Sequence, residues 1–263
     1  MFNMKRVARP KKSTSWGGVA EWYDAVIQDD DSYQNAVVLP NLMRVMRVAA
    51  DERVFDAACG SGFFAREFAR AGACVVASDI SPELIALARK NCDSDSAAAI
   101  SFHVASADAS EFVADASIDK ISIVLALQNM EHIERVMREC ARVLRPGGKL
   151  FFVLNHPTFR VPGASEWGWD EGARVQYRRV ERYMTEFKYR VQMHPGSDPS
   201  AVTFSFHRPL QLYVKHLSRA GFALTHLEEW VSNRKSSSGP RAGAENKVRN
   251  EIPLFLCVVA TKM

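Results

Sequence analysis

Short apolar runs alternate with amphipathic segments along most of the chain from residue 53 onward. Seven of the apolar runs have the length and composition of strands: RVFDAA, ACVVASD, ISFHVASAD, DKISIVLAL, KLFFVLN, ALTHLEEWV and IPLFLCVVA. Between most of them, apolar residues recur at three- and four-residue spacing, which is the periodicity of helices with one buried face. Strands that alternate with helices are typical of a parallel sheet covered by helices. The pattern therefore predicts an α/β fold.

The last two apolar runs, ALTHLEEWV and IPLFLCVVA, have no helical pattern between them. Strands joined without a crossover helix pair antiparallel. We therefore expect a seven-stranded, mostly parallel sheet with an antiparallel last strand and helices on both faces.

Three segments depart from this alternation. Residues 1–50 contain the helical patterns VAEWYDAVI and LPNLMRVMRVAA and are expected to form a helical cap before the main domain at 51–263. Residues 156–207 show alternating and aromatic-rich patterns, which predict a small antiparallel β insertion after the fifth strand. Residues 232–250 are expected to be a basic, flexible loop. Ligands bind at the carboxyl ends of parallel strands, where both later segments begin, so we expect 156–207 to form a substrate lid.

Composition and charge narrow the functional classes only slightly. The chain has 263 residues, 47% of them hydrophobic, and a net charge of +4, which is too small to indicate nucleic-acid binding by itself. Its five cysteines are scattered, which argues against a structural zinc site and a disulfide framework. No uncharged apolar run approaches the length of a membrane span. We expect a cytoplasmic protein that does not bind a membrane and has no metal site.

The stretch VFDAACGSGFFAREFA joins a strand to a helix through a glycine loop. Gly60, Gly62 and Ala65 fit the relaxed fingerprint G-x-G-x-x-G/A of nucleotide-binding folds. Glycine allows tight turning and close approach of the backbone to a ligand. The loop alone also permits a nicotinamide-dependent dehydrogenase, so the surrounding residues must decide.

Those surrounding residues resemble the class I S-adenosylmethionine-dependent methyltransferases. DAACGSG resembles the first signature of that family, D/E-x-G-x-G-x-G, with Ala58 at its third position. Asp79 matches the acid that holds the cofactor ribose, and Asp108 the acid that contacts the adenine amino group. ARVLRPGGKLFF matches the turn before the fifth strand. The resemblance covers residues 50–155 well and 208–263 in outline, and implies a Rossmann-like fold, S-adenosyl-L-methionine as cofactor and methyltransferase activity.

The resemblance and the strand ends together name a set of cofactor-binding candidates. They are Tyr23, Asp56, Ala58, Gly60, Gly62, Phe63, Asp79, Ile80, Ala107, Asp108 and Gln128. Asp56 can meet the cationic amino-acid end of the cofactor, and Tyr23 lies in a segment that resembles the family's amino-terminal lid. Local structure offers alternatives for three of them. Asp56 can tie down the loop backbone, Asp79 can cap the next turn, and Gln128 can cap a helix.

The expected reaction is methyl transfer to an oxygen or nitrogen of a small organic acceptor. A hydroxyl acceptor needs a base, and His156, directly after the fifth strand, is the best-placed candidate, followed by His194 and His207. Trp167 and Trp169 can form aromatic walls. Several arginines of the two overhanging segments can bind an acidic acceptor or pair with nearby glutamates. They are Arg178, Arg179, Arg182, Arg208, Arg234 and Arg241.

RNA or protein is the alternative acceptor class. The basic start MFNMKRVARPKK and the 232–250 loop would then bind it. No RNA-binding module accompanies the fold, and the N/D-P-P-Y type sequence of many base and amide N-methyltransferases is absent. A nucleic-acid partner is therefore not expected, and the sequence does not predict the oligomeric state.

Overall fold

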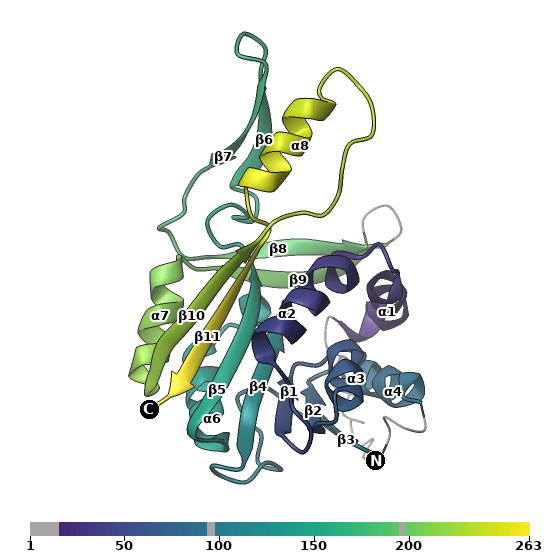
Figure 1. The fold of residues 1–263 in the computed structure, drawn as a ribbon, viewed down its shortest axis with the longest axis vertical. Coiled ribbons are helices and arrows are strands. Elements are labelled where there is room, and N and C mark those ends of the chain that lie inside the picture. Colours follow the sequence, from purple (N-terminus) through teal and green to yellow (C-terminus); the bar gives the residue numbers. More distant parts are fainter. Residues whose placement is uncertain (1–15, 94–97, 195–197) are drawn as a thin grey trace, which may run out of the picture.

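The computed structural model describes residues 16–93, 98–194 and 198–263. Seven strands form one sheet in the order β10-β11-β5-β4-β1-β2-β3 (Figure 1). Their bounds are β1 (Arg53–Ala57), β2 (Cys74–Asp79), β3 (Ile100–Val104), β4 (Ile118–Val124), β5 (Leu144–Asn155), β10 (Phe222–Trp230) and β11 (Phe255–Lys262). The strands β1 to β5 pair in parallel, while β11 pairs antiparallel with both β5 and β10. The predicted sheet with its antiparallel last strand is confirmed.

Helices cover both faces of the sheet, so consecutive apolar residues of a central strand can point into cores on opposite sides. In β5, Leu150, Phe152 and Leu154 join one core cluster, whereas Phe151 and Val153 join the other. The first cluster contains residues of α6 (Ile133–Val143) and α7 (Leu210–Arg219). The second contains residues of α2 (Leu39–Met46), α3 (Phe63–Arg70) and α4 (Pro82–Asn91).

The amino-terminal part of the described chain is helical. It consists of the short turn η1 (Gly17–Val19), α1 (Ala20–Gln28), the π-helical segment η2 (Gln34–Val38) and α2. The helix α1 lies beside α4, where the Asn91 amide donates to the Asp24 carboxylate at 3.0 Å. The basic stretch at residues 1–12 lies outside the described residues.

The insertion after β5 forms two antiparallel hairpins. The first pairs β6 (Ser165–Asp170) with β7 (Val175–Val180), and the second pairs β8 (Phe187–His194) with β9 (Asp198–His207). Figure 1 shows β8 and β9 lying across the carboxyl end of the sheet, while β6 and β7 project away from it. The antiparallel character predicted for this segment is confirmed. No helix in the part of the chain described here is long and apolar enough to cross a membrane.

The prediction of a flexible loop at 232–250 is wrong, because α8 (Ala242–Glu251) takes up its second half. This helix has a single buried residue, Val248, so its sequence shows no apolar stripe. Contacts with the first hairpin hold it instead. Arg241 pairs with Glu171 at 2.7 Å, and its guanidinium lies 4.5 Å from the centre of a Trp169 ring. The strands β10 and β11 still pair antiparallel, although a helix separates them.

Candidate functional site

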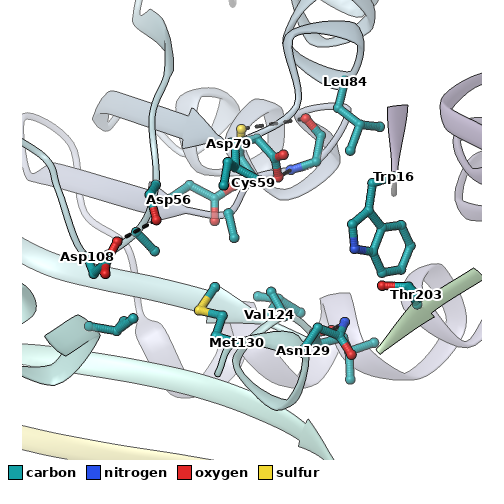
Figure 2. A pocket seen from close by; sticks show the side chains of 18 of the residues that line it. Trp16, Asp56, Cys59, Asp79, Leu84, Asp108, Val124, Asn129, Met130 and Thr203 are labelled. Atoms are coloured by element: carbon teal, nitrogen blue, oxygen red, sulfur yellow. Dashed lines mark hydrogen bonds between the residues drawn. The ribbon is translucent and has the colours of Figure 1, made fainter. Parts of the chain in front are cut away.

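A cavity of about 450 Å³ lies at the carboxyl ends of β1, β2 and β4. Its volume falls within the range of small-molecule pockets, ~300–1,000 Å³. Its walls come from the amino-terminal helix, the glycine loop, the segments after β2, β3 and β4, and the hairpin β8–β9. Figure 2 shows Asp56, Asp79 and Asp108 along one side of the cavity, facing Trp16 and Thr203 across it. The cavity lies where the sheet topology predicts a ligand site.

The glycine loop has the left-handed backbone that its sequence predicts. Gly60 has φ +57° and Gly62 has φ +76°. Gly60 lines the cavity, whereas Gly62 does not. A Cβ placed on Gly62 would lie 3.1 Å from Ala88 and 3.2 Å from Phe102. This position needs glycine because α3 packs closely against α4 and β3, and a contact of Gly62 with the cofactor stays a prediction.

Asp79, at the end of β2, holds the loop and lines the cavity at the same time. Its carboxylate accepts hydrogen bonds from the amides of Gly60 at 3.0 Å and Ser81 at 2.9 Å. Burial raises the pKa of Asp79 in spite of these bonds. Burial and the nearby Asp79 carboxylate together raise the pKa of Tyr23 to about 12. The local role considered for Asp79 thus coexists with a position from which it can contact a ligand.

Asp56, near the end of β1, carries a buried oxygen atom that lacks a partner. Its Oδ1 accepts a hydrogen bond from Ser122 Oγ at 2.6 Å, while its Oδ2 has no hydrogen-bond partner among the described residues. Only 1% of the residue is exposed. Burial raises the pKa of Asp56 to about 7, and the Ser122 bond opposes this shift. Because the residue lines the cavity, a cationic group placed there would satisfy this carboxylate.

The segment after β3 supplies a third carboxylate. Ser106 Oγ donates to Asp108 Oδ1 at 2.5 Å, and both residues line the cavity. Ala107 and Ile80 lie beside them in the lining, and Ile80 is exposed. An apolar surface with one oriented carboxylate suits a flat, hydrogen-bonding ring.

Nine of the predicted cofactor-binding residues therefore meet at one cavity. They are Tyr23, Asp56, Ala58, Gly60, Phe63, Asp79, Ile80, Ala107 and Asp108. Gln128 does not line it. The side-chain amide of Gln128 donates to the Leu125 carbonyl at 2.8 Å, within the turn η3 (Leu127–Asn129) that follows β4. This bond stabilises the turn, while the buried Oε1 of Gln128 has no partner among the described residues, and its neighbour Asn129 lines the cavity instead.

His156 does not reach the cavity, which corrects its assignment as the catalytic base. The ring is buried, with Nε2 2.7 Å from Glu229 Oε1 and Nδ1 accepting from the Thr158 amide at 3.2 Å. Burial lowers the pKa of His156. Nε2 links the residue after β5 to Glu229 of β10, while Nδ1 is engaged by the local turn at Thr158, so both ring nitrogens already have structural partners. His207 is buried too and donates from Nε2 to the Tyr183 carbonyl at 2.8 Å, and His194 lies at the end of β8.

Sequence reasoning missed much of the opposite wall of the cavity. The missed lining residues include Trp16, Met130, Glu131, His132, Lys188, Phe204 and Phe206. The stretch VTFSF alternates aromatic and polar residues, and a strand pattern of this kind places both phenylalanines on one face. His132 lies four residues after Gln128, in a stretch where the sequence drew attention only to the two amides.

Most arginines of the overhanging segments, and both tryptophans, make contacts away from the cavity. Arg179 pairs with Glu166 at 3.2 Å and with Glu181 at 2.6 Å, and the guanidinium of Arg178 lies 5.0 Å from the centre of a Trp167 ring. Among the described residues, the cavity lining contains none of the six arginines that the sequence singled out, and neither Trp167 nor Trp169. Contacts with neighbouring acids, carbonyls and aromatic rings account for most of this basic charge.

Known proteins match this chain in sequence and in fold. A family model described as "Methyltransferase domain" matches residues 55–152. The chain is 33% identical over 149 residues to the "Ubiquinone biosynthesis O-methyltransferase" of Xanthomonas oryzae, covering 54% of this chain and 58% of that protein. It is 35% identical over 115 residues to the "Demethylmenaquinone methyltransferase" of Tropheryma whipplei, covering 43% and 46%. The chain thus spans about half the length of these curated relatives.

A solved structure extends the likeness to nearly the whole fold. The S-adenosylmethionine dependent methyltransferase from Mesorhizobium loti superposes with a TM-score of 0.68 at 26% sequence identity. The match covers 85% of this chain and 96% of that one, and so includes far more than the segment matched by the family model.

Proposed function

We propose that this chain is a class I S-adenosylmethionine-dependent methyltransferase, with S-adenosylmethionine as its cofactor, and that it methylates an oxygen of a small organic acceptor. The observation that carries the proposal is the convergence of three strand-end carboxylates and the glycine loop on one cavity. Asp56, Asp79 and Asp108 come from three different strands or their following loops.

Each carboxylate suits a different part of the cofactor. Asp79 would accept hydrogen bonds from the ribose hydroxyls, and Asp108 from the adenine amino group. Asp56 would face the cationic amino-acid end, since its Oδ2 is a buried carboxylate oxygen with no donor among the described residues. The loop at Gly60 allows the backbone to approach the ligand closely. The residues present therefore fit this cofactor.

When bound, S-adenosylmethionine supplies an electrophilic methyl group: the acceptor oxygen forms the new bond to carbon, and the electron pair of the broken carbon–sulfur bond stays on sulfur. The protein's part is to align the acceptor and exclude water. Such positioning can lower the activation free energy by ~7–11 kcal/mol. Hairpin β8–β9 supplies Lys188, Thr203, Phe204 and Phe206 to the wall, so it serves as the substrate lid. The first hairpin, β6–β7, supplies none of the described lining residues.

A hydroxyl acceptor must also lose a proton. We assign this proton to His132, which lines the cavity beside Met130 and Glu131. Its Nδ1 lies 3.7 Å from Glu134 Oε1, beyond the distance of a direct hydrogen bond. The imidazole is half-exposed, so the proton can pass on to solvent.

The acceptor is best sought among ring compounds related to quinones. The name of one relative, an O-methyltransferase of ubiquinone biosynthesis, supports oxygen as the methylated atom. Trp16, Phe204 and Phe206 offer aromatic surface to a flat ring. RNA or protein as acceptor is not favoured, because Arg241 and Arg249 of the 232–250 segment are engaged within the fold.

The first test is a calorimetric titration of the protein with S-adenosylmethionine and, separately, with NADH. We expect micromolar affinity for the first and no binding of the second. Asp79→Asn should weaken cofactor binding at least tenfold with the fold retained, because a neutral amide replaces a charge-assisted acceptor. Lys215→Met, an exposed change on α7, is the control. Binding of NADH alone, or equal affinity of the Asp79→Asn variant, would refute the assignment.

Transfer itself is then tested with cofactor labelled in the methyl group. Catechol and 4-nitrocatechol serve as ring-bearing probes of the acceptor site. Labelled methyl ether should form with the wild-type protein and fall sharply in His132→Gln. Label found only on amines or on added RNA would contradict oxygen methylation of a small molecule.

A further inference from the structure

Charge is divided between the two ends of the cavity. Asp56, Asp79 and Asp108 lie at the end assigned to the cofactor. Lys188 is the only lysine or arginine that lines the cavity among the described residues. It comes from β8, within the insertion, and not from the loops of the sheet. The acids suit a cofactor that carries positive charge. A lysine would repel that charge, so we assign Lys188 to the methyl acceptor.

The hairpin presents Lys188 on an aromatic surface. Its Nζ lies 4.3 Å from the centre of the Phe204 ring and 5.2 Å from that of Phe206. The pair Lys188 and Phe206 are direct partners across the hairpin. The faces of the two aromatic rings attract the ammonium and hold it at the cavity wall.

The acidic partner nearest to Lys188 is a loose one. Glu131 Oε2 lies 3.8 Å from Lys188 Nζ, and both side chains are about half exposed. Exposed pairs at this distance contribute little, on the order of 0–1 kcal/mol. A ligand oxygen can therefore replace Glu131 as the partner of Lys188, or share the lysine with it, at a small cost in free energy.

The wall that carries Lys188 is fixed to the segment that carries His132. Arg208, buried at the base of β9, donates from Nη2 to the carbonyls of Met130 at 2.9 Å and Glu131 at 2.6 Å. These bonds hold the end of the hairpin against residues 130 and 131. Hydrogen bonds from Arg208 thus connect the hairpin that carries Lys188 to the segment that carries His132, on the acceptor side of the cavity.

We propose that Lys188 binds the reacting oxygen of the acceptor as its oxyanion, and that the site thereby selects acidic hydroxyls, such as those of phenols and enols, over amines. This inference rests on the proposed function. A fixed ammonium attracts an oxyanion and repels a protonated amine, so the same residue favours one nucleophile and disfavours the other. The proton of the acceptor hydroxyl passes to the His132 imidazole and then to solvent, and the oxygen electron pair thus freed forms the bond to the methyl carbon.

The direct test uses the absorbance of 4-nitrocatechol, which reports ionisation of its phenol. The probe is titrated with pH in the presence of protein and S-adenosylhomocysteine, so that no methyl transfer occurs. In the wild-type protein its apparent pKa should fall by at least about one unit, the effect of an opposite charge within hydrogen-bonding range. Lys188→Met should abolish this fall, and Lys188→Arg should retain part of it.

Arg190→Met is the matched control. Arg190 lies two residues along β8, is exposed, pairs with Phe204 across the hairpin and does not line the cavity. The Arg190→Met variant should lower the apparent pKa of 4-nitrocatechol as much as the wild-type protein does. An equal shift in Lys188→Met, or failure of the wild-type protein with bound S-adenosylhomocysteine to bind the probe, would overturn the inference.

Kinetics provide a second readout. Lys188→Met should lower kcat/KM for catechol by roughly 10²-fold at pH 7, and should move the rising limb of the pH profile to higher pH. Its calorimetric affinity for S-adenosylmethionine should stay unchanged, which also shows that the variant is folded. Preference for aniline over catechol in the wild-type protein would overturn the inference. If the wild-type protein itself does not bind S-adenosylmethionine, the proposed function is refuted instead.

Discussion

Replacing Asp56 with asparagine should stabilise the ligand-free protein and weaken its cofactor binding. The change keeps the shape of the side chain and the acceptor for Ser122, but removes the charge from a carboxyl whose Oδ2 has no partner among the described residues. Burial raises the pKa of Asp56 from 3.8 to about 7. A shift of about three units, at ~1.36 kcal/mol per unit, corresponds to about 4 kcal/mol.

The sign of this effect follows from proton binding. The folded state holds the Asp56 proton more tightly than the unfolded state, so the contribution of this residue to stability is complete below pH about 4 and is lost as the pH rises through about 7. Above that range the charged carboxylate opposes folding by up to about 4 kcal/mol. The amide of the Asp56→Asn variant cannot ionise, so the variant should gain over wild type as the pH rises. Each kcal/mol corresponds to ~2–4 °C in Tm for a domain of this size.

The assay is thermal unfolding of both proteins without ligand between pH 5 and 8.5. The Tm of Asp56→Asn should exceed that of wild type at pH 8 and approach it at pH 5. Calorimetry should show the opposite order for S-adenosylmethionine, with affinity lower by roughly 10–150-fold, the worth of a hydrogen bond to a charged group. Wild-type affinity should rise with pH through about 7, and the variant should show no such rise. A variant that is less stable at pH 8 and binds the cofactor normally would refute this account of Asp56.

Three further substitutions test other parts of the structure. Ala58→Gly should raise the free energy of unfolding by up to about 1 kcal/mol in urea titrations, because Ala58 has φ +61°, a left-handed conformation costly for alanine; a clear loss would contradict this. His156→Gln should lose ~1–3 kcal/mol of stability through its broken bond to Glu229, while the folded variant keeps its methyl-transfer rate. An inactive but stable variant would restore His156 as a catalytic candidate. Glu228, whose hydrogen bond from Arg44 lowers its pKa to about 2, stabilises the fold above pH about 4.5 and loses this effect as the pH falls towards 2. Glu228→Gln should therefore cost about 1 kcal/mol at pH 7, and an equal cost at pH 3 would count against the ion pair with Arg44.

The parts of the site that the sequence predicted are those carried by the sheet itself. Asp56 and Asp79 each follow an apolar run, and parallel topology brings all such strand ends to one edge. Strand length and side-chain alternation then fix where each carboxylate lies. The same logic placed Gly60 in the loop, since a left-handed turn after β1 needs glycine.

Predictions failed or were incomplete where a contact depends on a partner distant in sequence. Gly62 matches a nucleotide-binding signature, but its lack of a side chain is required by Phe102, forty residues later. His156 lies at the correct edge of the sheet, but Glu229 binds it away from the cavity. The helix α8 has no apolar stripe that would predict it. An ion pair and a tryptophan of the first hairpin hold it instead. None of these pairings leaves a periodic pattern in the sequence.

The division of charge in the cavity follows the division of the chain. The acids that we assign to the cofactor belong to segments whose positions the sheet dictates, so any protein with this topology can hold them there. Lys188, Phe204 and Phe206 belong to an insertion that the sheet does not constrain, and Arg208 ties that insertion back to residues 130 and 131. Substitutions in the hairpin should therefore change which acceptor is methylated while leaving cofactor affinity intact. Substitutions at the strand ends should do the reverse, because the residues assigned to the cofactor and those assigned to the acceptor come from different segments of the chain.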